Sequence, residues 1–267
     1  MLIVAREVLV QGVAAADGEN GVTDGELVEP CGKTVARAKI DMSNSHASRS
    51  TREPMHARRE MLRYLGYRGQ AITPDLETRI SEVAARCEEI ARPMAVWRTF
   101  PPEAVRLPGN DIVRHLDGAI EVVLMAVTLG HGVDRELRRL SLTDPLEQVI
   151  FDAAATAAVE RLADKTEAEI RTEAAERGLF CSWRFSPGYG DLPLDVQPDV
   201  LARLNAARRL GITYTRSHLM VPTKSVTAVI GVHAIPQEGV ADACDVCNLS
   251  AGCERAWTES RCGGGSC

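Results

Sequence analysis

The sequence predicts a mixed fold in which long helices cover a β-sheet. Two stretches, residues 73–91 and 145–176, carry apolar side chains at helical spacing. Two others, residues 119–128 and 225–233, are apolar and rich in β-branched residues, which favours strands. Of the 267 residues, 45% are hydrophobic and 25% are charged, which is enough for one large domain or two small ones.

The first part of the chain lacks the pattern of a folded domain. Gly, Asp, Glu and Ala dominate residues 11–30, and residues 1–54 sustain no helical or strand period, so disorder is expected there. Residues 1–10 are compatible with one short strand. An alternative is that Met55 is the natural start and that the preceding stretch is an over-long gene prediction.

The first folded elements are expected to be two helices. Residues 58–64 form a short helical pattern, and residues 73–91 form a longer one. Thr73 is placed to be the N-cap of the longer helix, and Pro74 occupies its first position. Cys87 lies on its apolar stripe, and the simplest interpretation is a buried thiol.

The next elements alternate between strand and helix. They are expected to be a strand, a short helix, the strongest strand of the chain and another short helix, at residues 94–100, 111–115, 119–128 and 134–141. Gly130 and Gly132 follow the strongest strand, where a glycine pair often lets a ligand or another backbone approach. His131 between them is either an ordinary loop residue or a ligand contact.

A long helix is expected over residues 145–176, starting after Thr143 and Asp144. Glu160 lies within an otherwise apolar face of this helix. A buried carboxylate is costly without a partner, so Glu160 either has a functional partner or simply faces water. The charged part, residues 164–176, is expected to be a solvated surface.

The last third of the domain contains the most unusual stretch, Arg184-Phe-Ser-Pro-Gly-Tyr-Gly-Asp191. Proline and two glycines exclude a helix interior and predict a tight, ordered turn. An ordinary surface loop is the alternative. The elements around it are expected to be a strand, a helix and three further strands, at residues 181–185, 195–210, 212–215, 220–221 and 225–233.

Residues 184–191 resemble the Arg-x-x-x-Gly-Tyr signature of the activation (reactivation) domain of cobalamin-dependent methionine synthase. Residues 220–228, Met-Val-Pro-Thr-Lys-Ser-Val-Thr-Ala, resemble the later Met-x-Pro-x-x-Ser-Val-Ser segment of that family. The resemblance implies an α+β fold, with a twisted, mainly antiparallel central sheet flanked by long helices. It also implies a free-standing short form of the domain over residues 55–236.

The same resemblance implies a site for S-adenosylmethionine. Arg184 would pair with the carboxylate of this ligand, and Glu160 would lie near its sulfonium or amino group. Tyr189 is the candidate catalytic residue, because its ring could lie against the face of a cobalamin or against the ligand. The other expected binding residues belong to the turn and are Ser186, Pro187, Gly188 and Tyr189.

The implied function is the reductive methylation of cob(II)alamin held by a partner. That partner would be a set of cobalamin-bearing methionine synthase modules or another corrinoid protein, with a possible reductase. A non-catalytic module that senses S-adenosylmethionine or binds a corrinoid protein is the alternative. A net charge of −6 without a basic block argues against nucleic acid, and the sequence suggests neither a membrane span nor an export signal, so a cytoplasmic protein is expected.

Residues 237–267 form a cysteine-rich tail. Cys244, Cys247 and Cys253 place three thiolates within ten residues, and Cys262 or Cys267 could supply a fourth. This density suits an iron–sulfur cluster or zinc. The hypothesis is a built-in electron source, and the alternatives are structural zinc, a flexible thiol tail, or a metalloprotein in which the folded domain is merely structural.

Overall fold

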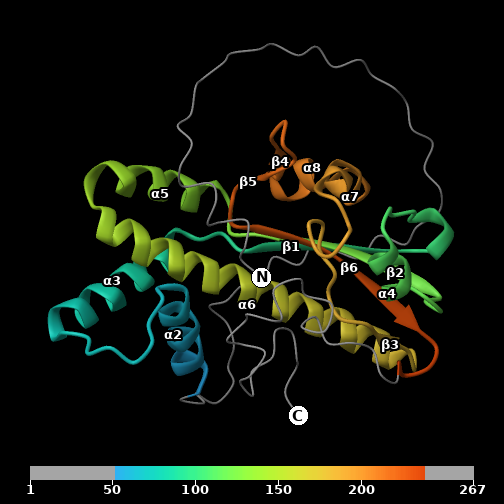
Figure 1. Cartoon of the computed structure of the whole chain (residues 1–267), viewed down its shortest axis with the longest axis horizontal. Helices are drawn as coiled ribbons and strands as arrows, with labels where there is room; N and C mark the ends of the chain where they lie inside the picture. The colour runs from blue at the N-terminus through green and yellow to red at the C-terminus, as the bar shows by residue number, and fades with distance from the viewer. Residues whose placement is uncertain (1–51, 238–267) are drawn as a thin grey trace.

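The computed structural model describes residues 52–237, with side chains from residue 58 onward. The fold is α+β, as expected: helices flank an antiparallel sheet (Figure 1). The helices are α2 (Arg52–Tyr64), α3 (Pro74–Ile90), α4 (Asn110–His115), α5 (His131–Thr143), α6 (Pro145–Glu176), α7 (Gln197–Arg203) and α8 (Ala206–Leu210). Two 3₁₀-helices are η2 (Pro102–Ala104) and η3 (Leu194–Val196).

The main sheet has four strands in the order β1-β2-β6-β3, and all neighbours are antiparallel. Its strands are β1 (Met94–Phe100), β2 (Glu121–Thr128), β3 (Phe180–Cys181) and β6 (Ser225–His233), and a separate hairpin joins β4 (Thr213–Tyr214) to β5 (Met220–Val221). The central pair, β2 and β6, runs in register from Glu121 opposite Val232 to Thr128 opposite Ser225. Every residue of β6 is buried, which explains its apolar, β-branched sequence.

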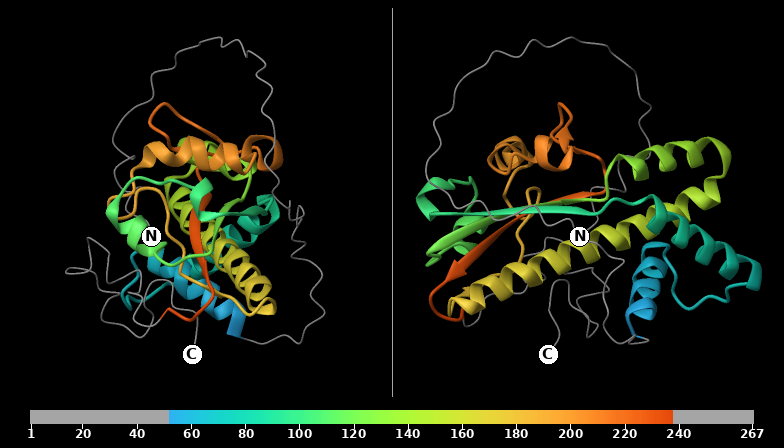
Figure 2. Two further views of the ribbon diagram at one scale, coloured as in Figure 1. Left: turned by 90° about the vertical axis from the view of Figure 1, so that its right-hand side faces the viewer. Right: turned by 180° about the vertical axis from the view of Figure 1, so that it is seen from behind.

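The sheet separates two hydrophobic clusters. On one face, alternate residues of β2 such as Val123 and Met125 pack with α2, α3, α5 and α6. On the other face, Val122 and Leu124 pack with α4, α7 and α8. Figure 2 shows α6 running along one side of the sheet and α7 and α8 lying on the other. The sheet is therefore covered on both faces.

The long helices begin where the sequence predicts. The hydroxyl of Thr73 accepts a hydrogen bond from the Leu76 N–H at 3.3 Å, which caps α3. The carboxylate of Asp144 accepts one from the Glu147 N–H at 3.0 Å, which caps α6. Helix α6 then continues for 32 residues and packs against the sheet and against α2, α3 and α5.

Two expectations for helical segments were wrong. His131 is not in a loop, because α5 begins there after Gly130, and its Nε2 lies 3.0 Å from the Gly211 carbonyl oxygen. Residues 164–176 are not simply a solvated surface, because Thr166 and Ile170 are buried against the rest of the domain. The sequence pattern there is charged because only one side of the helix faces the core.

Two further elements are shorter than expected. Residues 195–210 do not form one helix, since Asn205 adopts a left-handed conformation with φ of 51° between α7 and α8. Asn tolerates this conformation better than most residues. The strand expected over residues 181–185 is limited to β3, followed by a bridge between Phe185 and Val229.

The first helix, in contrast, begins earlier than expected. Helix α2 begins at Arg52, three residues before the expected domain start at residue 55.

A matched pair of phenylalanines tests the position of the core. Phe151 on α6 is 0% exposed and Phe180 on the edge strand β3 is 42% exposed. We expect Phe151→Ala to lower the free energy of unfolding by about 3–5 kcal/mol, because it leaves a cavity. Phe180→Ala should cost about 1 kcal/mol or less. Urea unfolding measures both, and equal losses would contradict this placement of the core.

Candidate functional site

The stretch that follows β3 crosses the edge of the sheet and then forms the predicted turn. Phe185 holds it to β6 through two backbone hydrogen bonds with Val229, of 2.9 and 2.8 Å. The turn closes through the Tyr189 N–H, which donates to Ser186 at 3.0 Å, and the Gly188 N–H, which donates to Leu192 at 2.8 Å. Gly188 has φ of 89°, a conformation that favours glycine. The ordered turn expected from the sequence is therefore present.

Asp191 fastens this turn to α4. Its carboxylate accepts the N–H groups of Asn110 at 2.6 Å and Asp111 at 3.0 Å, and Asp111 accepts the Asp191 N–H at 3.2 Å. The two backbone donors, Asp111 first, lower the pKa of Asp191 below its ordinary value. A side chain at Gly109 or Gly190 would collide with these aspartates, so glycine permits the close approach. Asp191 thus holds the turn in place.

Arg184 points from the edge of the sheet to three carboxylates of α6. Its Nη2 lies 2.8 Å from Asp164 Oδ1 and 3.7 Å from Glu160 Oε2, and its Nε lies 3.4 Å from Glu167 Oε2. These acids recur at i, i+4 and i+7, which places them on one face of the helix. The Arg184 side chain is only 9% exposed and that of Glu160 only 18%. Glu160 therefore does not simply face water, and the structure brings it together with Arg184.

Arg171 on α6 holds the same segment in place and was not recognised in the sequence. Its guanidinium donates to two consecutive carbonyls, of Cys181 at 2.7 Å and Ser182 at 2.8 Å. The same group donates to Glu167 Oε1 at 3.0 and 2.6 Å. The spacing of Glu167 and Arg171 is the i, i+4 pair that stabilises exposed helices, and this signal could have suggested the ion pair. The two backbone contacts had no signal in the sequence.

Two polar atoms of the predicted site are buried without a hydrogen bond to any described residue. They are Nη1 of Arg184 and Oγ of Ser186. Burying such groups without partners is costly, so atoms of this kind suit a ligand that can bond to them. Among the ion pairs of the described residues, three carboxylates face two guanidiniums, Arg171 and Arg184. This arrangement suits a ligand that combines a carboxylate with positive charge.

Tyr189 lies away from the Arg184 guanidinium. Its ring packs in the cluster on the other face of the sheet, with centroids 6.0 Å from Phe185 and 6.4 Å from Trp183. The N–H groups of Gly188 and Tyr189 are used by the turn itself. The carbonyls of Pro187 and Gly188 accept no hydrogen bond within the described part of the chain, which leaves them available to a ligand.

The segment 220–228, the second motif of the resemblance, is mostly withdrawn from solvent. Met220 and Val221 are half-buried in the hairpin, and residues 224–228 are buried. The amine of Lys224 contacts α6, at 2.7 Å from Asp152 Oδ1 and 2.9 Å from Thr156 Oγ1. Residues 220–228 therefore belong to the hairpin and to the central sheet, and they do not form an exposed face.

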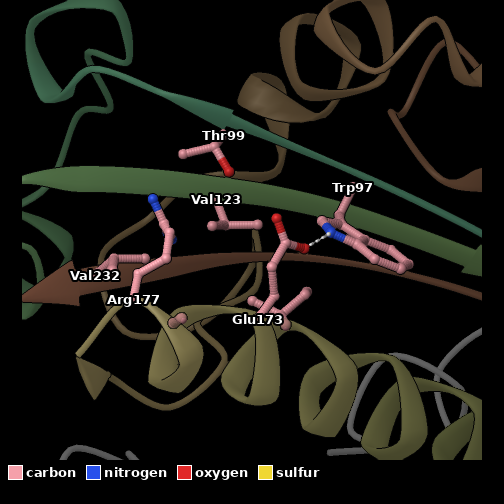
Figure 3. A pocket seen from close by; sticks show the side chains of 8 residues that line it. Trp97, Thr99, Val123, Glu173, Arg177 and Val232 are labelled. Carbon is pink, nitrogen blue, oxygen red and sulfur yellow. Dashed lines mark hydrogen bonds between the residues drawn. The ribbon is translucent and has the colours of Figure 1, made fainter. Parts of the chain in front are cut away.

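A small hollow, partly open to solvent, lies between the last turns of α6 and the sheet. Figure 3 shows Trp97 and Glu173 facing each other across it, with the indole N–H donating to Glu173 Oε2 at 3.4 Å. Arg177 at its rim is held by Glu121 at 2.7 Å. None of the predicted site residues lines this hollow.

The predicted metal ligands Cys244, Cys247, Cys253 and Cys262 lie outside the described residues. Within residues 58–237, no group of three or more histidine, cysteine, aspartate or glutamate side chains is placed to hold a metal ion. Cys87 is buried, as expected, and burial raises the pKa of its thiol to about 11. No helix of the described chain is long and apolar enough to cross a bilayer.

A histidine supports the base of the turn. His115 on α4 lies with Nε2 3.0 Å from the Ser182 hydroxyl oxygen, which also accepts the Gly231 N–H at 2.8 Å. Its ring stacks edge-on against Trp183 at a centroid distance of 4.5 Å. Burial lowers the pKa of His115 to about 4, so the ring is neutral at neutral pH.

Comparisons with known proteins find a similarity of structure, but none of sequence. No protein-family model matches the chain, and no curated protein matches it. Among solved structures, the chain is similar to the MetH reactivation domain bound to AdoHcy, with 15% identity and a TM-score of 0.49. The match covers 67% of this chain and 76% of that chain.

The burial of His115 as a neutral imidazole predicts that the stability of the fold depends on pH. The unfolded histidine binds a proton near pH 6.5 and the folded one near pH 4, so stability is full above 6.5 and falls as the pH drops towards 4. The slope for one proton is about 1.4 kcal/mol per pH unit. We expect His115→Gln, which does not titrate, to flatten this slope in urea unfolding from pH 7 to 4. An unchanged slope would show that His115 does not titrate differently on folding.

Proposed function

We propose that the domain binds S-adenosylmethionine at the edge of the sheet, beside Arg184 and Glu160. The observation that carries the proposal is the buried Nη1 of Arg184, which has no hydrogen-bond partner among the described residues although three carboxylates surround the same guanidinium. A zwitterionic amino acid with an added sulfonium matches this arrangement, because it brings one carboxylate and two positive charges. The motif resemblance of residues 184–191 supports the same ligand.

Each residue has a separate task in this proposal. Arg184 Nη1 donates to the ligand carboxylate, a charge-assisted bond that is stronger than a neutral one. Glu160 and its neighbours on α6 balance the ammonium and the sulfonium. The Ser186 hydroxyl and the carbonyls of Pro187 and Gly188 offer hydrogen bonds to the adenosine portion. S-adenosylmethionine supplies a methyl group, and the protein holds it at a fixed position.

We further propose that the domain serves a partner that carries cobalamin. The partner would be a set of methionine synthase modules or another corrinoid protein, and the setting would be cytoplasmic. Reductive methylation of cob(II)alamin needs one electron and the methyl group of S-adenosylmethionine. Tyr189 would contribute the surface that meets the corrin, and the same turn would offer groups to S-adenosylmethionine. A non-catalytic sensor of S-adenosylmethionine is the second candidate, because the same binding site would serve it.

The cysteine tail is proposed as the electron source, in the form of an iron–sulfur cluster bound by Cys244, Cys247, Cys253 and Cys262. Structural zinc is the alternative for the same ligands. Iron analysis and a visible spectrum of anaerobically purified protein separate the two, and a colourless protein without iron would end the electron-source proposal.

Replacement of Arg184 tests the binding site directly. Arg184→Lys keeps the positive charge among the carboxylates and removes the free Nη1. We expect isothermal titration calorimetry to show saturable binding of S-adenosylmethionine to the wild type and at least tenfold weaker binding to this variant. Arg177→Lys is the control, since Arg177 pairs with Glu121 elsewhere and should leave the affinity unchanged. Equal affinity of wild type and Arg184→Lys would overturn the site.

Methyl transfer separates the two candidate functions. The chain is mixed with a cob(II)alamin-bearing methionine synthase fragment that lacks a reactivation domain, a chemical reductant and S-adenosylmethionine. We expect the absorption spectrum of methylcobalamin to appear with the wild type and far more slowly with Tyr189→Leu. Leucine keeps apolar packing against Trp183 and Phe185, so the turn should stay folded, and calorimetry measures how much affinity for S-adenosylmethionine the variant retains. Binding without any transfer by the wild type would favour the sensor.

A further inference from the structure

The corner between α5 and α6 exposes a row of aliphatic side chains. Leu142 in the last turn of α5 is 84% exposed, and Leu146 and Val149 in the first turns of α6 are 46% and 56% exposed. Leu146 and Val149 are one helical turn apart, and only three residues separate Leu142 from Leu146. Single exposed aliphatics are ordinary, whereas three within eight residues at one corner of the fold point to an interaction surface.

The acidic and basic side chains around this row differ in whether they form ion pairs. The acids of the corner are already paired: Glu136 with Arg139 at 2.8 Å, Asp144 with Arg79, and Glu147 with Arg86. Arg135 and Arg138, by contrast, are exposed and form no ion pair with any residue that the structure describes. They lie seven and four residues before Leu142, on the same face of α5. The corner therefore presents an apolar row that continues into unpaired positive charge.

We propose that this corner, defined by Arg135, Arg138, Leu142, Leu146 and Val149, is a docking surface for an amphipathic helix of a partner protein. The apolar face of that helix would pack on the three aliphatic side chains, and carboxylates beside that face would pair with the two arginines. Packing of helix on helix suits the spacing of Leu146 and Val149. Paired charges at the rim would set the orientation of the partner more than its affinity.

A helix fits this surface better than an anionic membrane does. Membrane-surface helices combine a wide apolar face, usually with Trp or Phe, with many basic residues on the other face. The corner has three aliphatic side chains, no exposed aromatic ring among them and two free arginines. Its narrow apolar row matches the seam of a helix–helix contact.

The corner is separate from the proposed S-adenosylmethionine site. Leu146 and Asp164 are 18 residues apart on the straight helix α6, which corresponds to about 27 Å. In Figure 1 the corner forms the end of the molecule opposite to β3. A partner helix bound at the corner would leave the region around Arg184 open. The proposal thus stands even if the domain does not bind S-adenosylmethionine.

The test uses the full chain and a defined probe. The probe is a fluorescein-labelled helical peptide with leucines at i, i+3 and i+7 and glutamates on both sides of them, and binding is followed by fluorescence anisotropy. We expect saturable binding that weakens at least tenfold in Leu142→Asp/Leu146→Asp. Arg135→Gln/Arg138→Gln should weaken it at least threefold and reduce its dependence on salt. A peptide with glutamine in place of glutamate should bind the wild type as weakly as the original peptide binds the arginine variant.

Two controls make the result decisive. Val113→Asp alters an exposed aliphatic residue on α4 and should leave peptide binding unchanged. Circular dichroism confirms that each variant is folded. Failure of the wild type to bind the peptide, or equal binding by the Leu142→Asp/Leu146→Asp variant, would overturn the proposal. Flotation of the wild type with phosphatidylserine vesicles, in the absence of peptide binding, would assign the corner to a membrane surface instead.

Discussion

The guanidinium of Arg184, enclosed by three carboxylates of one helix, is the interaction on which the candidate site depends. A charge with so little exposure must be balanced, and Glu160, Asp164 and Glu167 balance it from successive turns of α6. The pairing ties the end of β3 and the glycine–tyrosine turn to the helix that supports the sheet. One nitrogen of that guanidinium forms no hydrogen bond among the described residues, and this is the atom that we propose pairs with a ligand carboxylate.

Helix α6 links three regions of the molecule along its length. Its first turns belong to the exposed corner, and a run of small buried residues, Ala153–Ala157, follows. From Glu160 to Arg171 it carries the acids around Arg184 and the guanidinium that binds the carbonyls of residues 181 and 182. An unbroken helix keeps these parts at fixed separations. The turn is fixed independently at its other end, where Asp191 and Asp111 join it to α4. The site is thus supported from both sides of the sheet.

Much of the fold could be predicted because its signals are local. The caps at Thr73 and Asp144 and the apolar runs of β2 and β6 depend on short stretches of sequence. The break at Asn205 could not be foreseen, since a left-handed asparagine inside a helical pattern is chosen by tertiary packing. In the site, the resemblance and residue chemistry singled out Arg184 and Glu160. They did not indicate Asp164, Glu167 or Arg171, because a charged helical face looks the same whether it meets water or a buried arginine.

The Tyr189 ring and the Arg184 side chain lie on opposite sides of the sheet edge, so the position of the ligand decides which of them it contacts. The most direct measurement is a crystal structure of the full chain with S-adenosylmethionine. The account predicts that the ligand carboxylate lies within hydrogen-bond distance of Arg184 Nη1, with the sulfonium on the side of Glu160. A ligand bound elsewhere, with the Arg184 cluster unchanged, would contradict it.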